Sequence, residues 1–143
     1  MKNKELSKFL VRAKKNTYAS GKKPNVLEDG SEEFIYQENN LLYKDNYKES
    51  NLFRGRETVF DNEKAIWEMD YNGKAHSNLI DLNVIYEFLK KALNEVDERK
   101  PFRGPSIFSK KHLLYRNNSR GNVSKFDGIE SIFYNGAEVY SLT

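Results

Sequence analysis

Apolar residues near the N-terminus recur at the spacing of an amphipathic helix. The opposite side of the same stretch is basic, so one face suits a protein core and the other suits water. We therefore predict a helix over about residues 4–15 that packs one face on a sheet. The apolar positions are Leu6, Phe9, Leu10 and Ala13, and the basic positions are Lys4, Lys8, Arg12 and Lys15.

A loop and three strands are predicted after this helix. Residues 21–33 contain Gly, Pro and an Asp-Gly pair with little apolar periodicity, which is typical of a loop. Runs rich in Tyr, Phe, Ile, Val and Trp follow near residues 34–47, 52–60 and 65–71, and these residue types favour strands. Asn62-Glu63 is the expected tight turn between the last two runs.

The second half of the chain shows the same order of patterns. Asp81 or Asn83 can cap a helix that runs to about Val96, and its apolar stripe places Phe88 in the core. Asn135-Gly136 is a strong hairpin turn signal. Three more strands are predicted, near residues 112–118, 125–133 and 138–142.

One motif occurs in both halves of the sequence. Phe53 to Met69 aligns without a gap to Phe126 to Leu142. Both stretches read F-x-G-x-E-x-[VI]-F-x-N, and both have an aromatic residue further along, Trp67 or Tyr140. This match predicts an internal duplication of a helix plus a three-stranded antiparallel meander, of the α+β class, about a pseudo-twofold axis. We expect units at about residues 5–73 and 85–143 within a single domain, 1–143.

Cysteine and long apolar segments are both missing from the sequence. With no cysteine among 143 residues, disulfides, thiolate zinc sites and cysteine nucleophiles are excluded. A reducing compartment suits this composition, and we expect the cytoplasm. No run approaches transmembrane length and the N-terminus lacks the apolar core of a signal peptide, so no membrane partner is expected.

Charge is distributed unevenly. Residues 1–23 contain eight Lys or Arg and one Glu, whereas residues 24–50 contain seven acidic residues and two lysines. We favour a solvated surface with local charge balance. The alternative is nucleic-acid binding, which the net charge of +3 supports weakly and which would fall steeply with salt. The basic residues in question are Lys4, Lys8, Arg12, Lys15, Lys22 and Lys23.

Glu57 and Glu130 occupy the same position in the two copies of the motif. Strand geometry places each on one face with a glycine two residues earlier, and such a glycine leaves space for a backbone or a ligand. One hypothesis is a paired acidic ligand site, with Trp67 beside Glu57 and Tyr140 beside Glu130. The other, which we favour, is that each carboxylate accepts bonds from neighbouring groups and holds the fold together.

Two further candidates lie after the predicted helices. Tyr18 lies within Thr-Tyr-Ala-Ser-Gly and Arg103 within Phe-Arg-Gly-Pro, each an aromatic residue followed by turn residues. An arginine held by a Gly-Pro turn can bind a carboxylate or phosphate in a forked geometry. Equally, it can form a structural ion pair with Glu57 or Glu130.

Conventional catalytic and cofactor signatures do not occur in the sequence. His76 and His112 are the only histidines, and neither has the spaced partners of a triad or a metal set, so both are expected at the surface. There is no Walker loop, dinucleotide-binding fingerprint or zinc signature, and no cofactor or metal is expected.

The motifs together resemble an uncharacterised bacterial and archaeal family known only as a domain of unknown function. The resemblance covers nearly the whole chain and rests on five motifs. In that family the domain occurs alone or after a helix-turn-helix region in regulators of transcription, which implies sensing or partner binding by association. The motifs are Thr17 to Gly21, Phe53-x-Gly55-x-Glu57, Trp67-x-Met69-x-Tyr71-x-Gly73, Phe102 to Pro105 and Phe126-x-Gly128-x-Glu130.

Two departures from that pattern limit what the resemblance implies. No helix-turn-helix region precedes the domain in this sequence, which argues against direct gene regulation. The second copy of the motif would need its counterpart of Tyr71-x-Gly73 beyond Thr143, so we expect any symmetric site to be incomplete.

Three functions are compatible with these observations. The leading hypothesis is a non-enzymatic binding or sensor module that takes a small ligand or a protein segment between its two halves. The second is an enzyme that uses Glu57 or Glu130 as a general acid or base, which requires a raised carboxyl pKa in a dry cleft. The third is a nucleic-acid-associated accessory protein.

Overall fold

Two α-helices cover one face of a single antiparallel sheet. The helices are α1 Asn3–Lys15 and α2 Leu82–Leu93, and a 3₁₀ turn, η1, spans Tyr18–Ser20. The strands are β1 Asn25–Val26, β2 Glu32–Glu38, β3 Leu41–Glu49, β4 Leu52–Asp61, β5 Lys64–Ala75, β6 Ile107–Lys110, β7 Leu113–Asn122, β8 Lys125–Tyr134 and β9 Ala137–Leu142.

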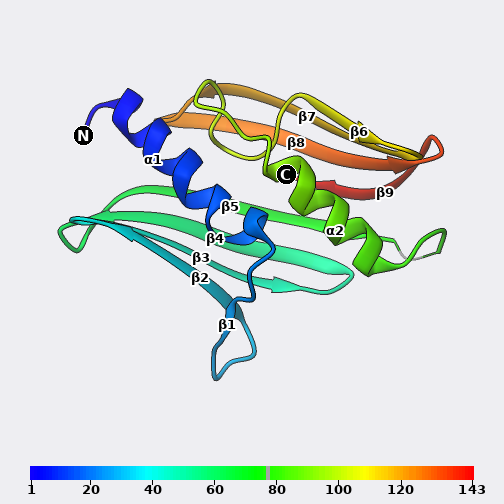
Figure 1. Cartoon of the computed structure of the whole chain (residues 1–143), viewed down its shortest axis with the longest axis horizontal. Coiled ribbons are helices and arrows are strands. Elements are labelled where there is room, and N and C mark those ends of the chain that lie inside the picture. The colour runs from blue at the N-terminus through cyan, green and yellow to red at the C-terminus, as the bar shows by residue number, and fades with distance from the viewer. Residues whose placement is uncertain (77) are drawn as a thin grey trace.

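The strands form one sheet in the order β1-β2-β3-β4-β5-β9-β8-β7-β6. This is a computed structural model, and it describes residues 1–76 and 78–143. Figure 1 shows β2 to β5 along one side of the molecule, β6 to β9 along the other, and both helices crossing the same side of the curved sheet. The sheet thus wraps around a core that the helices close.

The predicted fold class, a duplicated helix plus three-stranded meander of the α+β class, is wrong. The run expected as one strand over residues 34–47 is two strands, because Asn39 takes a left-handed φ of 53° and turns the chain. Asn adopts this conformation more readily than most residues, yet the aromatic residues on both sides masked the turn. Residues 107–110, where no strand was predicted, form a further strand, and β5 pairs with β9 to join all nine strands.

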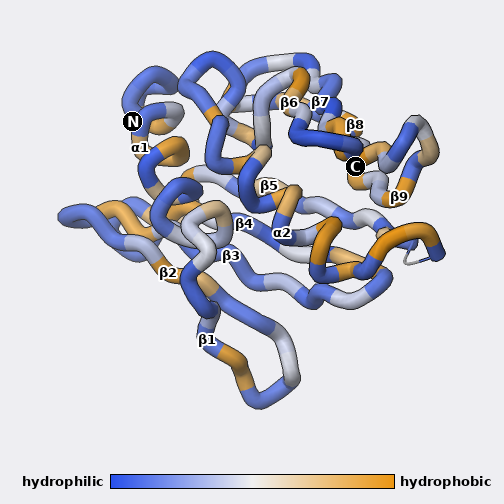
Figure 2. Tube along the Cα trace, turned by 45° about the vertical axis from the view of Figure 1, so that its right-hand side comes forward, coloured by the Kyte–Doolittle hydropathy of each residue, from blue (hydrophilic) through white to orange (hydrophobic). Residues whose placement is uncertain are grey.

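Both helices form where the apolar periodicity predicts them. Leu6, Phe9, Leu10 and Ala13 are buried in α1, and Phe88 is buried in α2. Figure 2 shows hydrophobic segments alternating with hydrophilic ones along the helices. No helix in the described part of the chain is long and apolar enough to cross a membrane. The cytoplasmic location stays a prediction.

Two hairpin turns and one helix cap lie where the sequence predicts them. Asn62 and Glu63 take left-handed φ angles of 48° and 69°, and Asn135 and Gly136 take 47° and 84°. These angles suit the tight hairpins that connect β4 to β5 and β8 to β9. The Asp81 side chain accepts a hydrogen bond of 2.8 Å from the backbone N–H of Asn83, so Asp81 is the N-cap of α2.

The contact between β5 and β9 is short and leaves a split in the sheet. Only residues 73–75 of β5 pair with residues 140–142 of β9. On its other side, β9 pairs with β8 from Glu130 onward. Beyond the end of β9, the first part of β5 and the first part of β8 therefore have no strand between them.

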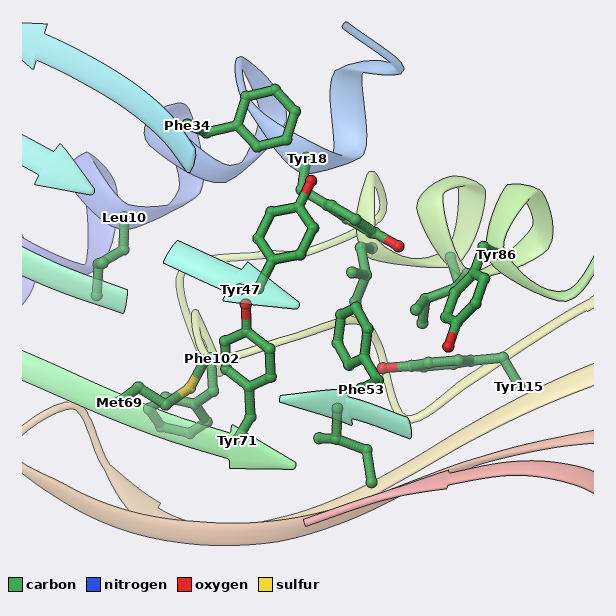
Figure 3. Close-up of a cluster of buried hydrophobic side chains, with 14 of the residues drawn as sticks. Leu10, Tyr18, Phe34, Tyr47, Phe53, Met69, Tyr71, Tyr86, Phe102 and Tyr115 are labelled. Atoms are coloured by element: carbon green, nitrogen blue, oxygen red, sulfur yellow. The ribbon is translucent and has the colours of Figure 1, made fainter. Parts of the chain in front are cut away.

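An aromatic cluster fills the core between the sheet and the helices. Phe53 lies at its centre, and Figure 3 shows it among tyrosine side chains that come from several elements. Aromatic pairs at such distances add stabilisation beyond the area they bury. Five ring centroids lie 5.4–6.5 Å from that of Phe53, those of Tyr18, Tyr47, Tyr71, Tyr86 and Tyr140.

Replacing Phe88 by Ala should destabilise the protein strongly. Phe88 is buried in α2 and its ring centroid lies 5.5 Å from that of Phe108 on β6. Truncation of a buried aromatic residue costs about 3–5 kcal/mol. Guanidinium denaturation measures the loss, with Val84→Ala as the control because Val84 lies exposed on the same helix. Equal losses for the two variants would contradict the assigned helix face.

Candidate functional site

Arg103 lies at the centre of a buried polar network. Its side chain is 11% exposed, and it contacts Glu130 through two hydrogen bonds, 3.1 Å from Nε and 2.9 Å from Nη2. The guanidinium also lies 5.1 Å from the centre of the Tyr71 ring. Of the two partners expected for Arg103, the structure thus gives it Glu130, in the forked geometry that arginine favours.

Glu130 is ionised and fully engaged. Burial alone would raise its pKa, but Arg103 and two tyrosine hydroxyls outweigh that effect and lower the pKa below its ordinary value. Tyr115 donates to Oε2 at 2.5 Å and Tyr140 to Oε1 at 2.8 Å. A carboxylate with this many donors has little tendency to take up a proton.

Gly104 fixes the loop that carries Arg103. Its backbone N–H donates to the Tyr115 hydroxyl at 3.0 Å. A Cβ atom at this position would lie 2.7 Å from the same hydroxyl oxygen, so any side chain would push Tyr115 away from Glu130. The loop, the tyrosine and the carboxylate therefore hold one another in place.

Glu57 has a different set of partners from Glu130. Its Oε1 accepts hydrogen bonds from Lys14 Nζ, at 2.6 Å, and from the Tyr43 hydroxyl. Lys14 Nζ also donates to the carbonyl oxygen of Phe102 at 2.6 Å, which connects α1 to the Arg103 loop. Burial lowers the pKa of Lys14, and the charge of Glu57 opposes that shift. The two glutamates of the repeated motif are thus both buried but not equivalent.

Two members of this network, Lys14 and Asp45, were missed in the sequence. Asp45 is buried on β3 and accepts a hydrogen bond of 2.5 Å from the Tyr71 hydroxyl. Alternate residues of a strand share one face, so Asp45 lies on the same face as Tyr43 and Tyr47. Both tyrosines are buried, and this alternation would have placed Asp45 on the inner face. Lys14 follows Leu10 by four residues and so shares its buried helix face.

The remaining candidates have structural partners of their own. Trp67 does not donate its indole N–H to Glu57, because Nε1 donates to the carbonyl of Val123 at 2.9 Å. Tyr18 donates to Glu49 at 2.6 Å. Both histidines, His76 and His112, are exposed as expected. Within the described residues, no group of three or more His, Cys, Asp or Glu is arranged to hold a metal ion.

The four basic residues predicted for the outer face of α1 are exposed, whereas Lys14, for which no such prediction was made, is buried. One of them, Arg12, forms an ion pair of 2.8 Å with Glu38, so part of the acidic segment does neutralise the helix. Nucleic-acid binding stays a prediction. The exposed residues of this face are Lys4, Lys8, Arg12 and Lys15.

The glycines of the repeated motif differ in what lies above them. A Cβ atom at Gly55 would run into the Tyr71 hydroxyl, so that tyrosine occupies the space the glycine leaves. At Gly128 the nearest atom would be Ser119 Cβ at 3.0 Å, on the neighbouring strand. The three nearest atoms belong to Ser119 and Asn118 and none is aromatic, and Gly128 lines a pocket of about 190 Å³.

This Gly128 pocket lies at the split between β5 and β8. Both apolar and polar side chains form its wall. Its apolar lining residues are Met69, Phe102, Phe126, Ile129 and Leu142, and its polar lining residues are Asp70, Tyr71, Arg103, Asn117, Ser119, Asp127, Glu130 and Thr143. A combination of apolar wall and converging polar groups is the usual composition of a small-molecule site.

The fold and the site define a small protein in which one antiparallel sheet and two helices enclose a buried charged network. The chain belongs to the family described as a domain of unknown function (DUF5680), which matches residues 45–143. That match includes Asp45, Glu57, Arg103 and Glu130. No curated protein and no solved structure gives a significant match to the chain.

Replacing Glu130 by Ala should destabilise the protein by about 3–5 kcal/mol, because it leaves the buried Arg103 charge without its partner. Asp127→Ala on the same strand is the control. Asp127 pairs with Arg120 at the surface, where both side chains are more than half exposed, and such pairs contribute about 0–1 kcal/mol. Urea denaturation of the two variants measures the difference. A Glu130→Ala variant as stable as the control would show that the network does not hold the fold together.

Proposed function

We propose that this protein is a ligand-binding module whose site is the Gly128 pocket. The observation that carries this proposal is the space above Gly128, which opens at the split between β5 and β8 and reaches Arg103. Pockets that combine an apolar wall with a few converging polar groups are the default binding sites of small domains. A sensing role, as the family resemblance implies, would follow from such binding.

The chemistry of the two glutamates supports binding rather than acid–base catalysis. A general acid or base works best with a pKa near the operating pH. Glu130 has a lowered pKa and accepts four hydrogen bonds, which leaves it little capacity to exchange a proton with a substrate. Glu57 adjoins a separate cavity of about 20 Å³, which is too small for an organic substrate.

The pocket volume limits the size of the ligand. At about 190 Å³ it is somewhat larger than an engineered apolar cavity of about 150 Å³ that binds benzene. A single six-membered ring with one polar head group would therefore fit. Larger ligands such as nucleotides would not.

Arg103 determines the kind of head group. Its Nε and Nη2 bind Glu130 and Tyr140, while Nη1 donates no hydrogen bond to any described residue. Nη1 is also not among the fully buried atoms without a partner, so it retains some accessible surface. Asn117 and Ser119 add hydrogen-bonding groups to the same wall. We infer that the head group accepts hydrogen bonds, as a carboxylate does.

Benzoate is a suitable probe for this site, and its binding should be measured by ¹H–¹⁵N NMR titration. We expect benzoate to shift the backbone amides of Ser119, Gly128 and Arg103. Ser119→Phe should abolish these shifts, because the larger side chain occupies the pocket. Asn118→Phe is the matched control, since Asn118 is exposed on the next position of the same strand.

Two outcomes would contradict the proposal in different ways. Shifts that map elsewhere, or that survive in Ser119→Phe, would remove the Gly128 pocket as the site. Benzylamine, which has the same ring and a cationic head, should bind more weakly than benzoate. Equal or tighter binding of benzylamine would overturn the assignment of the head group to Arg103.

A further inference from the structure

Two acidic side chains lie opposite each other on the buried face of the sheet. Asp45 on β3 and Glu57 on β4 are direct partners in the antiparallel register, and their exposed fractions are only 4% and 2%. Side chains at directly opposed positions have Cβ atoms about 4.5–5.5 Å apart. Their carboxyl groups therefore share one dry environment, in which two negative charges disfavour each other.

Each carboxyl group has one oxygen that accepts no hydrogen bond from the described residues. Glu57 binds Lys14 and Tyr43 through Oε1 alone. Its Oε2 is the only fully buried side-chain nitrogen or oxygen atom of the described residues that has no hydrogen-bond partner. Asp45 accepts from Tyr71 through Oδ1, and no hydrogen bond reaches its Oδ2. A fully buried acceptor without a donor, as Glu57 Oε2 is among the described residues, is rare in native proteins, so the missing donor needs an explanation.

The charges around the pair do not balance if both groups are ionised. Six titratable groups act on Asp45: Lys14 from α1, Tyr43 and Tyr47 from its own strand, Glu57, Tyr71 and Arg103. Lys14 binds Glu57, and Arg103 binds Glu130. Asp45, Glu57 and Glu130 are three buried carboxyl groups, and they share the two cations Lys14 and Arg103. An unpaired buried carboxylate is costly, and a proton is the simplest way to neutralise it.

We propose that Asp45 and Glu57 form a proton-binding site, in which a protonated Asp45 donates a hydrogen bond to Glu57 Oε2 directly or through one water molecule. Both residues line the small cavity of about 20 Å³ near Tyr18 and Phe102. A cavity of this size holds about one water molecule. The proton supplies the donor that Oε2 lacks and removes the excess negative charge.

The proton affinity of Asp45 determines the pH range of this effect. Burial, reinforced by the charge of Glu57, raises the pKa of Asp45 from its ordinary 3.8 to about 7. Between these values the folded protein holds a proton that the unfolded chain releases. The contribution to stability is therefore full below about pH 4 and is lost as the pH rises through about 7.

Infrared spectroscopy of the folded protein tests the proposal directly. At pH 6 the wild type should show the C=O stretch of one buried protonated carboxyl group, which should disappear as the pH rises through about 7. Asp45→Asn should lack this band, whereas Asp70→Asn should keep it, because Asp70 is exposed although it is adjacent in sequence to Tyr71, the tyrosine that binds Asp45. Absence of a protonated carboxyl band from the wild type at pH 6 would overturn the proposal.

Denaturation against pH gives a second, independent measurement. The urea midpoint of the wild type should fall between pH 4 and 7 relative to that of Asp45→Asn, whose amide supplies a donor at every pH. Glu57→Gln should move the loss of the infrared band to lower pH, because it removes the neighbouring negative charge. The proton site would be contradicted if Asp45→Asn had the same dependence of urea midpoint on pH as the wild type and Glu57→Gln lost its infrared band at the wild-type pH. If a variant does not fold, ¹³C NMR titration of the wild-type carboxyl groups decides the question.

Discussion

The ion pair between Arg103 and Glu130 is the interaction on which the rest of the site depends. A buried pair gains little net stability over an apolar core, because desolvation offsets the attraction, but it requires a defined geometry. It places the Arg103 loop against the sheet, so that the carbonyl of Phe102 can accept a hydrogen bond from Lys14. Lys14 in turn binds Glu57. The helix, the loop and both halves of the sheet are therefore positioned by one continuous set of charged groups.

One tyrosine accounts for the difference between the two halves. Tyr71 fills the space over Gly55, covers Arg103 with its ring and donates its hydroxyl to Asp45. Over Gly128, where the sheet splits beyond the end of β9, the nearest atoms of the described residues belong to Ser119 and Asn118 instead of a tyrosine. The same short motif therefore gives a closed, charged interior in one half and an open pocket in the other. The difference comes from the neighbouring strand, since the motif itself is the same.

The proposed pocket and the proposed proton site adjoin the same two residues, Arg103 and Tyr71. Arg103 lines both the Gly128 pocket and the small cavity beside Asp45. A negative charge placed at Arg103 by a ligand and a negative charge on Asp45 act on the same guanidinium. Charges inside a dry interior are weakly screened, so the two sites share one electrostatic environment.

The sequence by itself determined the local features of this protein. Helical periodicity located α1 and α2, turn residues located the hairpins at Asn62 and Asn135, and strand alternation placed Glu57 and Glu130 on the inner face. These features depend on neighbours along the chain. Only the tertiary structure decided the single nine-stranded sheet, the partner of Arg103 and the roles of Lys14 and Asp45. Those depend on which distant segments meet, and a buried charge has the same sequence signature as a solvated one until its partner is known.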